Sequence, residues 1–195
     1  MTGPAALGLV LAAGAGSRMG RPKALVTDAD GRPWLHTAIE ALRDGGCDQV
    51  LLVLGAEADR AETLVESMAV TVIRAQDWAD GMSASLSAGL RAVQEHLIDR
   101  PREFGAVVIT LVDLPDVDER VVARVIEKVG TDRSSLGRAV FDGEPGHPVV
   151  VGLDHLPGIL ESTTGDRGAR DYLRERGLTL VECGDLASGR DVDTL

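Results

Sequence analysis

The chain has 195 residues, 44% of them hydrophobic, and a formal net charge of −11 at pH 7. This length and composition allow a sizeable core, and we expect residues 1–195 to form a single domain. The acidic balance argues against a protein that coats nucleic acid, because neutralising its phosphates needs a basic face. Two cysteines are too few for a disulfide framework, and their spacing suggests no metal cluster.

The N-terminus lacks the features of an export signal. Residues 1–4 carry no basic segment, and the first apolar run contains a glycine and ends at Arg18. No run of about 18 or more apolar residues is present to span a bilayer. We therefore expect a cytoplasmic protein without membrane or nucleic-acid partners.

Apolar strand-like runs alternate with amphipathic segments of helical period along most of the chain. We predict strands at Leu7–Ala13, Gln49–Gly55, Val70–Arg74, Ala106–Val112, Ser135–Phe141, Pro148–Gly152 and Thr179–Cys183. We predict helices at Trp34–Arg43, Asp59–Met68, Ser83–Leu97 and Asp118–Val129, and a last one from Gly165–Arg170 through Leu173. Unbroken apolar strands separated by helices imply a mostly parallel sheet covered on both faces. Such sheets bind ligands beyond the C-terminal ends of their strands, so polar functional residues should follow each strand.

A glycine-rich loop follows the first predicted strand. Gly14, Gly16 and Gly20 allow positive φ and a close approach of the backbone to a ligand. Arg18 and Lys23 add two fixed cations. Glycine amides flanked by Arg and Lys are the ingredients of a triphosphate cradle, although an ordinary strand-to-helix loop with surface charges is the alternative.

The third and fourth predicted strands are also followed by polar residues. After the third strand come Gln76, Gly81 and a serine-rich helix start with Ser83 and Ser85. Ser83 is a candidate helix cap, and the free amides there could hold an oxyanion or a base edge. Asp113, at the end of the fourth strand, is well placed to bind Mg²⁺, which favours one or two carboxylates plus substrate phosphates. A capping or turn aspartate is the alternative.

Three later segments carry weaker signals. His147 lies in a turn-rich link between two short strands and could contact a substrate, although a single histidine in a loop is more often solvated or a local hydrogen-bond donor. Gly165–Arg170 opens a helix whose free amides and arginines could meet an anion, and charge balancing on a solvated helix is an equal alternative. Near the C-terminus, Asp191 and Asp193 alternate and therefore point to the same side of an extended segment. This allows a second metal ligand, with a frayed acidic terminus as the alternative.

Together, these motifs resemble a known family. Leu11–Lys23 resembles the signature of nucleotidyltransferases with a Rossmann-like, three-layer α/β/α fold. Gly81–Leu86, Gly146–Val149 and Gly165–Arg170 are similar to the pattern of molybdopterin cytidylyltransferases, and Asp191–Thr194 is similar to the closing motif of that family. The resemblance covers nearly the whole chain in order.

The resemblance implies roles for particular residues. The nucleotide would be bound by Leu11, Ala12, Ala13, Gly14, Gly16, Arg18, Lys23, Gln76 and Gly81. The second substrate would face Ser83, Ser85, His147 and Asp166, and Mg²⁺ would be held by Asp113 with Asp193 or Asp191. Arg18, Lys23 and Asp113 would be the catalytic residues. Related guanylyltransferases tend to have Ala-Gly-Gly where this chain has Ala12-Ala13-Gly14, which favours CTP.

The expected reaction is attack by a terminal phosphate of the acceptor on the α-phosphorus of a nucleoside triphosphate. That phosphate is already ionised near neutral pH, which explains why the sequence supplies no obvious nucleophile or catalytic dyad. Molybdopterin is the favoured acceptor, and a molybdenum enzyme would receive the product. Phospholactate or a sugar phosphate is an alternative acceptor, and a non-catalytic protein that binds and delivers molybdenum cofactor is the alternative function.

Overall fold

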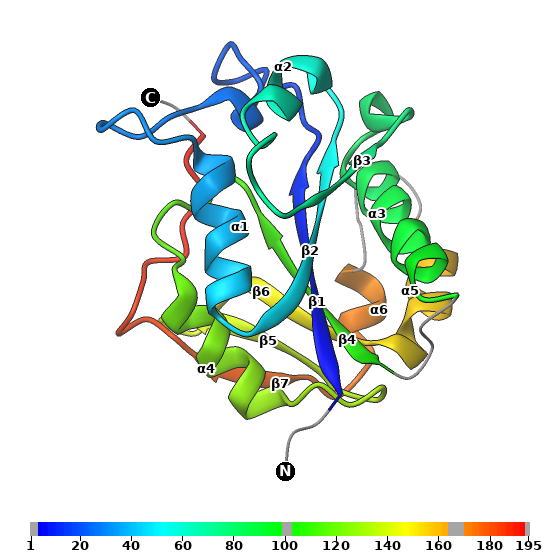
Figure 1. The fold of residues 1–195 in the computed structure, drawn as a ribbon. Coiled ribbons are helices and arrows are strands. Elements are labelled where there is room, and N and C mark those ends of the chain that lie inside the picture. Colours follow the sequence, from blue (N-terminus) through cyan, green and yellow to red (C-terminus); the bar gives the residue numbers. More distant parts are fainter. Residues whose placement is uncertain (1–3, 99–102, 164–169, 194–195) are drawn as a thin grey trace.

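The computed structural model describes residues 4–98, 103–163 and 170–193, which form one seven-stranded sheet with helices on both faces (Figure 1). The strands are β1 (Ala5–Ala12), β2 (Cys47–Leu54), β3 (Thr71–Arg74), β4 (Phe104–Leu111), β5 (Leu136–Phe141), β6 (Glu144–Gly152) and β7 (Thr179–Glu182). The helices are α1 (Trp34–Asp44), α2 (Ala58–Thr63), α3 (Met82–His96), α4 (Glu119–Val129), α5 (Leu156–Ser162) and α6 (Arg170–Arg174). The predicted three-layer α/β/α architecture is confirmed.

The two faces of the sheet have separate hydrophobic cores. Ala6 and Val10 of β1 point into one core, which contains the apolar faces of α1 and α4. Leu7 and Leu9 point into the other, which contains α3, α5 and α6. This alternation follows from the period of two in a strand. It explains why β1 is apolar throughout, since both of its faces are covered by helices (Figure 1).

The strand order is β3-β2-β1-β4-β6-β5-β7, and only β6 runs antiparallel to its neighbours. The chain builds outward from β1 through β2 to β3 and then returns to place β4 on the other side of β1. β1 and β4 therefore flank the point at which the strand order reverses. In open α/β sheets, ligands bind beyond the C-terminal strand ends at such a point.

A tight hairpin explains the reversed strand. β5 and β6 are joined by Asp142 and Gly143, whose φ values of 52° and 84° suit a two-residue hairpin turn. Because β6 begins at Glu144, His147 lies within a strand and not in the loop expected from the sequence. The glycines and prolines around His147 suggested a loop, but this stretch pairs with β5 in the sheet.

Two helical segments differ from the prediction. The helix predicted over Asp59–Met68 is shorter, because α2 ends at Thr63. Helix α5 was not predicted, since its seven residues are too few to establish a helical period and include Pro157. The predicted helix start at Gly165 lies outside the described residues, and α6 begins at Arg170.

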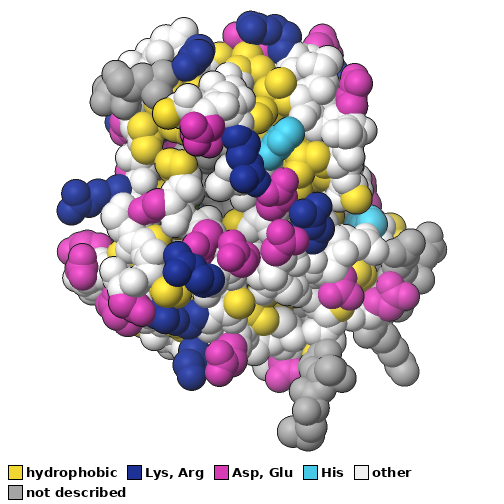
Figure 2. Space-filling view, turned by 60° about the vertical axis from the view of Figure 1, so that its left-hand side comes forward, with side chains coloured by type: hydrophobic (Ala, Val, Ile, Leu, Met, Phe, Trp, Pro, Cys, Tyr) yellow, Lys and Arg dark blue, Asp and Glu magenta, His cyan; other side chains and the backbone are white. Residues whose placement is uncertain are grey.

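None of the helices that the structure describes is both long and apolar enough to cross a membrane. On the face drawn in Figure 2, Lys and Arg side chains are interspersed with Asp and Glu. Among the described residues visible there, the positive charges do not form a continuous basic surface, as expected from the net charge of −11.

Candidate active site

The loop after β1 is a tight turn that depends on glycine. Gly16 has φ of 60°, and a Cβ atom there would lie 1.9 Å from the carbonyl oxygen of Arg21. The amide of Met19 donates to the carbonyl of Gly16 at 2.9 Å and closes the turn. Gly14, in contrast, is exposed, and a Cβ atom at that position would meet nothing within 4 Å. The loop thus combines one sterically required glycine with an open backbone that a ligand can approach.

A cavity of about 570 Å³ lies over the C-terminal ends of β1 and β4. Eleven of the residues singled out in the sequence line it: Leu11, Ala12, Ala13, Gly14, Gly16, Arg18, Lys23, Gly81, Ser85, Asp113 and Asp193. The sequence did not single out Trp78 or Met82, which also line it. A tryptophan between Gln76 and Gly81, in a segment that follows a strand, is the signal that could have indicated a wall of the cavity.

Lys23 links two carboxylates at the edge of this cavity. Its Nζ atom lies 2.5 Å from Oδ2 of Asp113 and 2.7 Å from Oδ1 of Asp193. Burial disfavours the charged lysine, but the hydrogen bonds with both aspartates outweigh it and raise the pKa of Lys23. Hydrogen bonding with Lys23 in turn lowers the pKa of Asp193. Lys23 and Asp193 are therefore both charged at neutral pH.

Arg18 contributes a second cation from a different position. Its guanidinium pairs with the other carboxylate oxygen of Asp193, and 77% of its side chain is exposed. An ion pair this exposed adds little to stability. Arg18 is therefore free to exchange Asp193 for a ligand at small cost, whereas Lys23 is held more firmly.

Three carboxylates approach one another closely enough to share a metal ion. Oxygen atoms of Asp113, Asp191 and Asp193 all lie within 4.8 Å of one another. The ammonium group of Lys23 already lies between two of them, so this position accommodates a cation. Carboxylates from two segments of the chain, open to a cavity, suit Mg²⁺ or Mn²⁺ with phosphate oxygens as further ligands.

The C-terminal segment is held beside this carboxylate cluster by hydrogen bonds to Asp116 and Asp113, which follow β4. The amide and hydroxyl of Ser188 both donate to Oδ2 of Asp116, at 2.7 and 2.6 Å. Further along, the amide of Val192 donates to the carbonyl of Asp113 at 3.0 Å. These contacts fix the backbone on both sides of Asp191 and place Asp193 beside Lys23.

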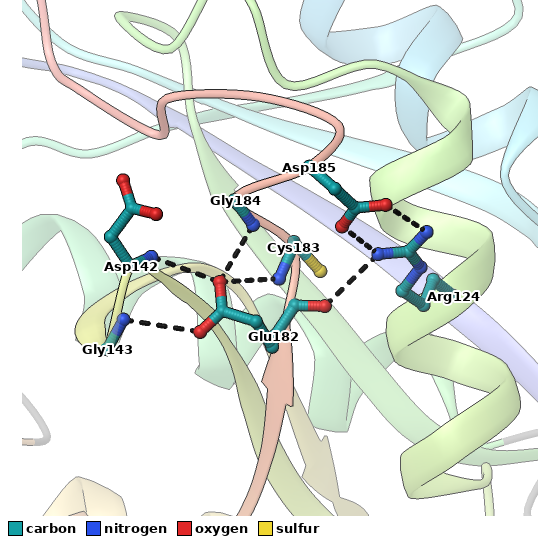
Figure 3. Close-up of polar contacts among 7 residues, drawn as sticks. All are labelled: Arg124, Asp142, Gly143, Glu182, Cys183, Gly184 and Asp185. Atoms are coloured by element: carbon teal, nitrogen blue, oxygen red, sulfur yellow. Dashed lines mark hydrogen bonds and ion pairs between the residues drawn. The ribbon is translucent and has the colours of Figure 1, made fainter.

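The start of the same segment is attached to the β5–β6 hairpin through Glu182 (Figure 3). The carboxylate of Glu182 accepts backbone N–H bonds of 2.8–3.2 Å from Asp142, Gly143, Cys183 and Gly184. Close by, Arg124 of α4 forms an ion pair with Asp185 and donates to the carbonyl of Glu182. The segment that carries the metal-binding candidates therefore starts from a fixed point.

The remaining sequence candidates lie elsewhere. Gln76 is exposed and lines neither this cavity nor the smaller one beside it. Ser83 is buried inside α3 and lines neither cavity. The prediction that Ser83 caps this helix is wrong, because the cap is Gly81 with φ of 107°. Asp166 lies outside the described residues.

The smaller cavity, of about 120 Å³, shares Leu11, Met82 and Leu111 with the first. His147 lines it, and burial, together with the charge of Arg138, lowers the pKa of the imidazole to about 4. Arg138 also lines this cavity and was not singled out from the sequence. A single charged residue within the apolar run Ser135–Phe141 is the signal that could have revealed it.

A glycine loop, two cations and a carboxylate cluster at the reversal point of a parallel sheet define an α/β nucleotide-binding protein of the nucleotidyltransferase class. Residues 8–180 match the MobA-like NTP transferase domain, and the chain belongs to this family. The resemblance to this group seen in the sequence is thereby confirmed.

Individual relatives differ in their names. The protein called nicotine blue oxidoreductase from Paenarthrobacter nicotinovorans is 33% identical, over 98% of this chain and 94% of its own. A probable molybdenum cofactor guanylyltransferase from Rhodopirellula baltica is 31% identical, over 58% of this chain and 51% of its own. Among solved structures, Rv0371c from Mycobacterium tuberculosis superposes with a TM-score of 0.76 at 27% identity, covering 99% of this chain and 95% of its own. A manganese complex of Rv0371c superposes with a TM-score of 0.69 at 25% identity, covering 92% of this chain and 87% of its own.

Proposed function

We propose that this chain transfers a nucleoside monophosphate from a nucleoside triphosphate to a phosphorylated acceptor and releases pyrophosphate. The observation that carries this proposal is the cluster of Lys23, Asp113 and Asp193 beside the glycine loop. It combines a partly buried cation, an acidic pair and open backbone amides in one cavity of about 570 Å³. These are the groups that a triphosphate and its metal ion need.

In this proposal, the cations act on the triphosphate. The loop amides from Gly14 to Gly16 approach the phosphates, and Arg18 exchanges Asp193 for a phosphate oxygen. Lys23 moves from its two carboxylates to the phosphates and stabilises negative charge as pyrophosphate leaves. Ala12, Ala13 and Gly81 border the base, and Trp78 forms an additional wall of the cavity.

Asp113, Asp193 and Asp191 would hold the divalent ion. When bound, Mg²⁺ or Mn²⁺ neutralises phosphate charge and orients the triphosphate. The protein does not need to deprotonate the acceptor, since its terminal phosphate is already ionised. Catalysis then rests on positioning and on charge stabilisation by side chains of this chain.

We further propose CTP as the donor and a pterin-type acceptor such as molybdopterin, whose product a molybdenum enzyme would receive. The Ala12-Ala13-Gly14 sequence favours cytidine, and the relative named as a molybdenum cofactor guanylyltransferase supports an acceptor of this kind. Phospholactate and sugar phosphates remain the competing acceptors.

Pyrophosphate release tests this proposal. The purified chain is incubated with Mg²⁺ or Mn²⁺ and each of the four nucleoside triphosphates, with and without molybdopterin, phospholactate or a sugar phosphate. We expect release that requires the metal and an acceptor and is fastest with CTP and molybdopterin. Asp113→Ala should abolish it, whereas Asp154→Asn, which alters a surface ion pair with Arg133, should not. No release with any pairing would contradict the proposal and favour the delivery function.

The relative named nicotine blue oxidoreductase supports a second candidate, the reduction of a compound like nicotine blue, because it matches nearly the full length of this chain. In that case the same cavity would bind the nucleotide portion of a nicotinamide donor. Oxidation of NADH or NADPH in the presence of nicotine blue, followed by absorbance, tests it. Rapid oxidation that is unaffected by Asp113→Ala, together with no pyrophosphate release, would favour this candidate.

A further inference from the structure

Arg138 is a charged residue in the middle of an otherwise apolar strand. It lies on β5 between the buried residues Gly137 and Ala139. Its Nε and Nη2 atoms donate to the carbonyl of Gly146 on β6, at 3.0 and 2.7 Å. Two bonds to one acceptor fix the plane of the guanidinium. Nη1 is not used in these bonds, and the side chain lines the smaller cavity.

Among the residues that the structure describes, no carboxylate balances the charge of Arg138. Other arginines, including Arg74 and Arg124, form ion pairs with acidic side chains. Within the ranges that the structure describes, neither Arg138 nor its neighbour Arg170 of α6 forms one. Burial lowers the pKa of Arg138, and the charge of Arg170 lowers it further. A partly buried cation without a counter-charge is costly, so a ligand with a negative charge would be stabilised here.

The rest of the smaller cavity is apolar. Its walls include Leu86, Ile109, Val149, Val151 and Leu173. His147 is the remaining polar group on the wall, and its low pKa keeps it neutral at pH 7, so it adds no charge. The cavity therefore suits a small apolar framework that carries one anionic group.

The position of this cavity relates it to the reaction. It shares three wall residues with the large cavity, so a molecule whose reacting phosphate lies near Lys23 can extend into it. Arg138 and Arg170 would then contact the end of the acceptor that does not react.

We propose that Arg138, assisted by Arg170, determines acceptor specificity by binding a second anionic group on an apolar part of the acceptor. This inference rests on the proposed function, since it assigns the smaller cavity to the acceptor. It favours acceptors that carry a carboxylate or another anion in addition to the reacting phosphate. Sugar phosphates without such a group would bind less tightly.

Benzoate and benzamide test the proposal without any nucleotide, because they have nearly the same shape and differ in charge. Their dissociation constants are measured by NMR titration, with the imidazole signals of His147 reporting occupancy of the smaller cavity. We expect benzoate to bind at least tenfold more tightly than benzamide. We expect Arg138→Met and Arg170→Met to remove this preference, and Arg133→Met, which alters a surface arginine paired with Asp154, to keep it.

Equal binding of the two compounds, or unchanged benzoate binding by Arg138→Met, would overturn the proposal. If Arg138→Met does not fold, the comparison in the wild-type chain and in Arg170→Met still decides. Pyrophosphate release is measured separately on the wild-type chain and on the same variants. A wild-type chain that releases pyrophosphate but does not prefer benzoate contradicts only this inference, whereas a wild-type chain that prefers benzoate but releases no pyrophosphate contradicts only the proposed function.

Discussion

Lys23 occupies the position between Asp113 and Asp193 in which a divalent cation would also be stabilised. The ammonium group and a metal ion therefore compete for the same two carboxylates. Its side chain is 19% exposed and that of Asp113 is 13% exposed, so solvent screens this competition only in part.

This competition predicts opposite effects of Lys23→Ala on binding and on turnover. Without nucleotide, Mn²⁺ should bind roughly three- to tenfold more tightly, which corresponds to about 1 kcal/mol from removal of the competing ion pair. Turnover should fall by about 10² or more, because one donor to the developing charge is lost. Titration with Mn²⁺ monitored by electron paramagnetic resonance gives the first value and pyrophosphate release the second. Weaker Mn²⁺ binding would show that Lys23 supports the site and does not compete for it.

Gly14 and Gly16 of the loop after β1 predict a contrast in stability between their alanine variants. Gly16→Ala should reduce the free energy of unfolding by about 1–3 kcal/mol, because a side chain at φ of 60° is strained and meets the carbonyl of Arg21. Gly14→Ala is the matched control and should change it by less than about 0.5 kcal/mol, since its Cβ meets nothing within 4 Å. Urea unfolding of both variants measures the difference. Equal destabilisation would contradict the described geometry of the loop.

At the scale of elements, the C-terminal segment is positioned by its contacts with the ends of other elements. Ser188 is bound to Asp116, in the segment that links β4 to α4, and this contact precedes the metal-binding candidates by only a few residues. Asp116 and Ser188 line neither cavity, so they would affect metal binding only by positioning the backbone of the C-terminal segment.

Removing this contact should weaken metal binding without removing a ligand. Asp116→Asn and Ser188→Ala should each raise the dissociation constant of Mn²⁺ by about three- to tenfold, the equivalent of one hydrogen bond. Asp154→Asn, far from the segment in the chain, should leave it unchanged. Calorimetric titration with Mn²⁺ measures these constants, and an unchanged value in both variants would remove the positioning role of this contact.

The Glu182 contacts predict a pH dependence of stability. Backbone N–H groups, that of Gly184 above all, lower the pKa of Glu182 below its ordinary value. A lowered pKa in the folded state means that the stabilisation is fully present above the unfolded value of about 4.3 and is lost as the pH falls through the folded value.

Wild type should therefore be more stable than Glu182→Gln by a constant amount from about pH 5.5 to 8, and this difference should shrink below about pH 4. Glu175→Gln, at an exposed position for which no such contacts are described, should show no comparable trend. Chemical unfolding at a series of pH values measures both. A difference that grows on acidification would contradict the assigned hydrogen bonds.

At the scale of the whole molecule, the sequence was sufficient for the strands and long helices that have a strong local pattern. Unbroken apolar runs such as Leu7–Ala13 predicted the parallel strands. A strand that is covered on both faces carries apolar residues at successive positions, without the alternation of apolar and polar residues seen in half-exposed strands. The glycine loop and Asp113 could be located because the ligand-binding residues of an α/β sheet follow the C-terminal ends of its strands. Both line one cavity in the structure, although their catalytic roles remain predictions.

Features that depend on contacts between distant segments could not be predicted. The sequence left Asp191 and Asp193 equivalent, and only the folded C-terminal segment shows that Asp193 meets Lys23. Arg138 became a candidate only when the β5–β6 hairpin placed its guanidinium against Gly146 and beside a cavity. Gln76 follows a strand as expected, but its side chain faces solvent, since strand order alone does not determine the direction of a side chain.

Transfer of the α-phosphate of a nucleotide is the most direct test of the account. CTP labelled at the α-phosphorus is incubated with molybdopterin, Mg²⁺ and the wild-type chain, and the products are separated by chromatography. The account predicts that the label appears in a product that contains both cytidine monophosphate and the acceptor, and that Asp113→Ala prevents its formation. Label found only in unreacted CTP, under conditions in which CTP binds with saturation, would contradict the account.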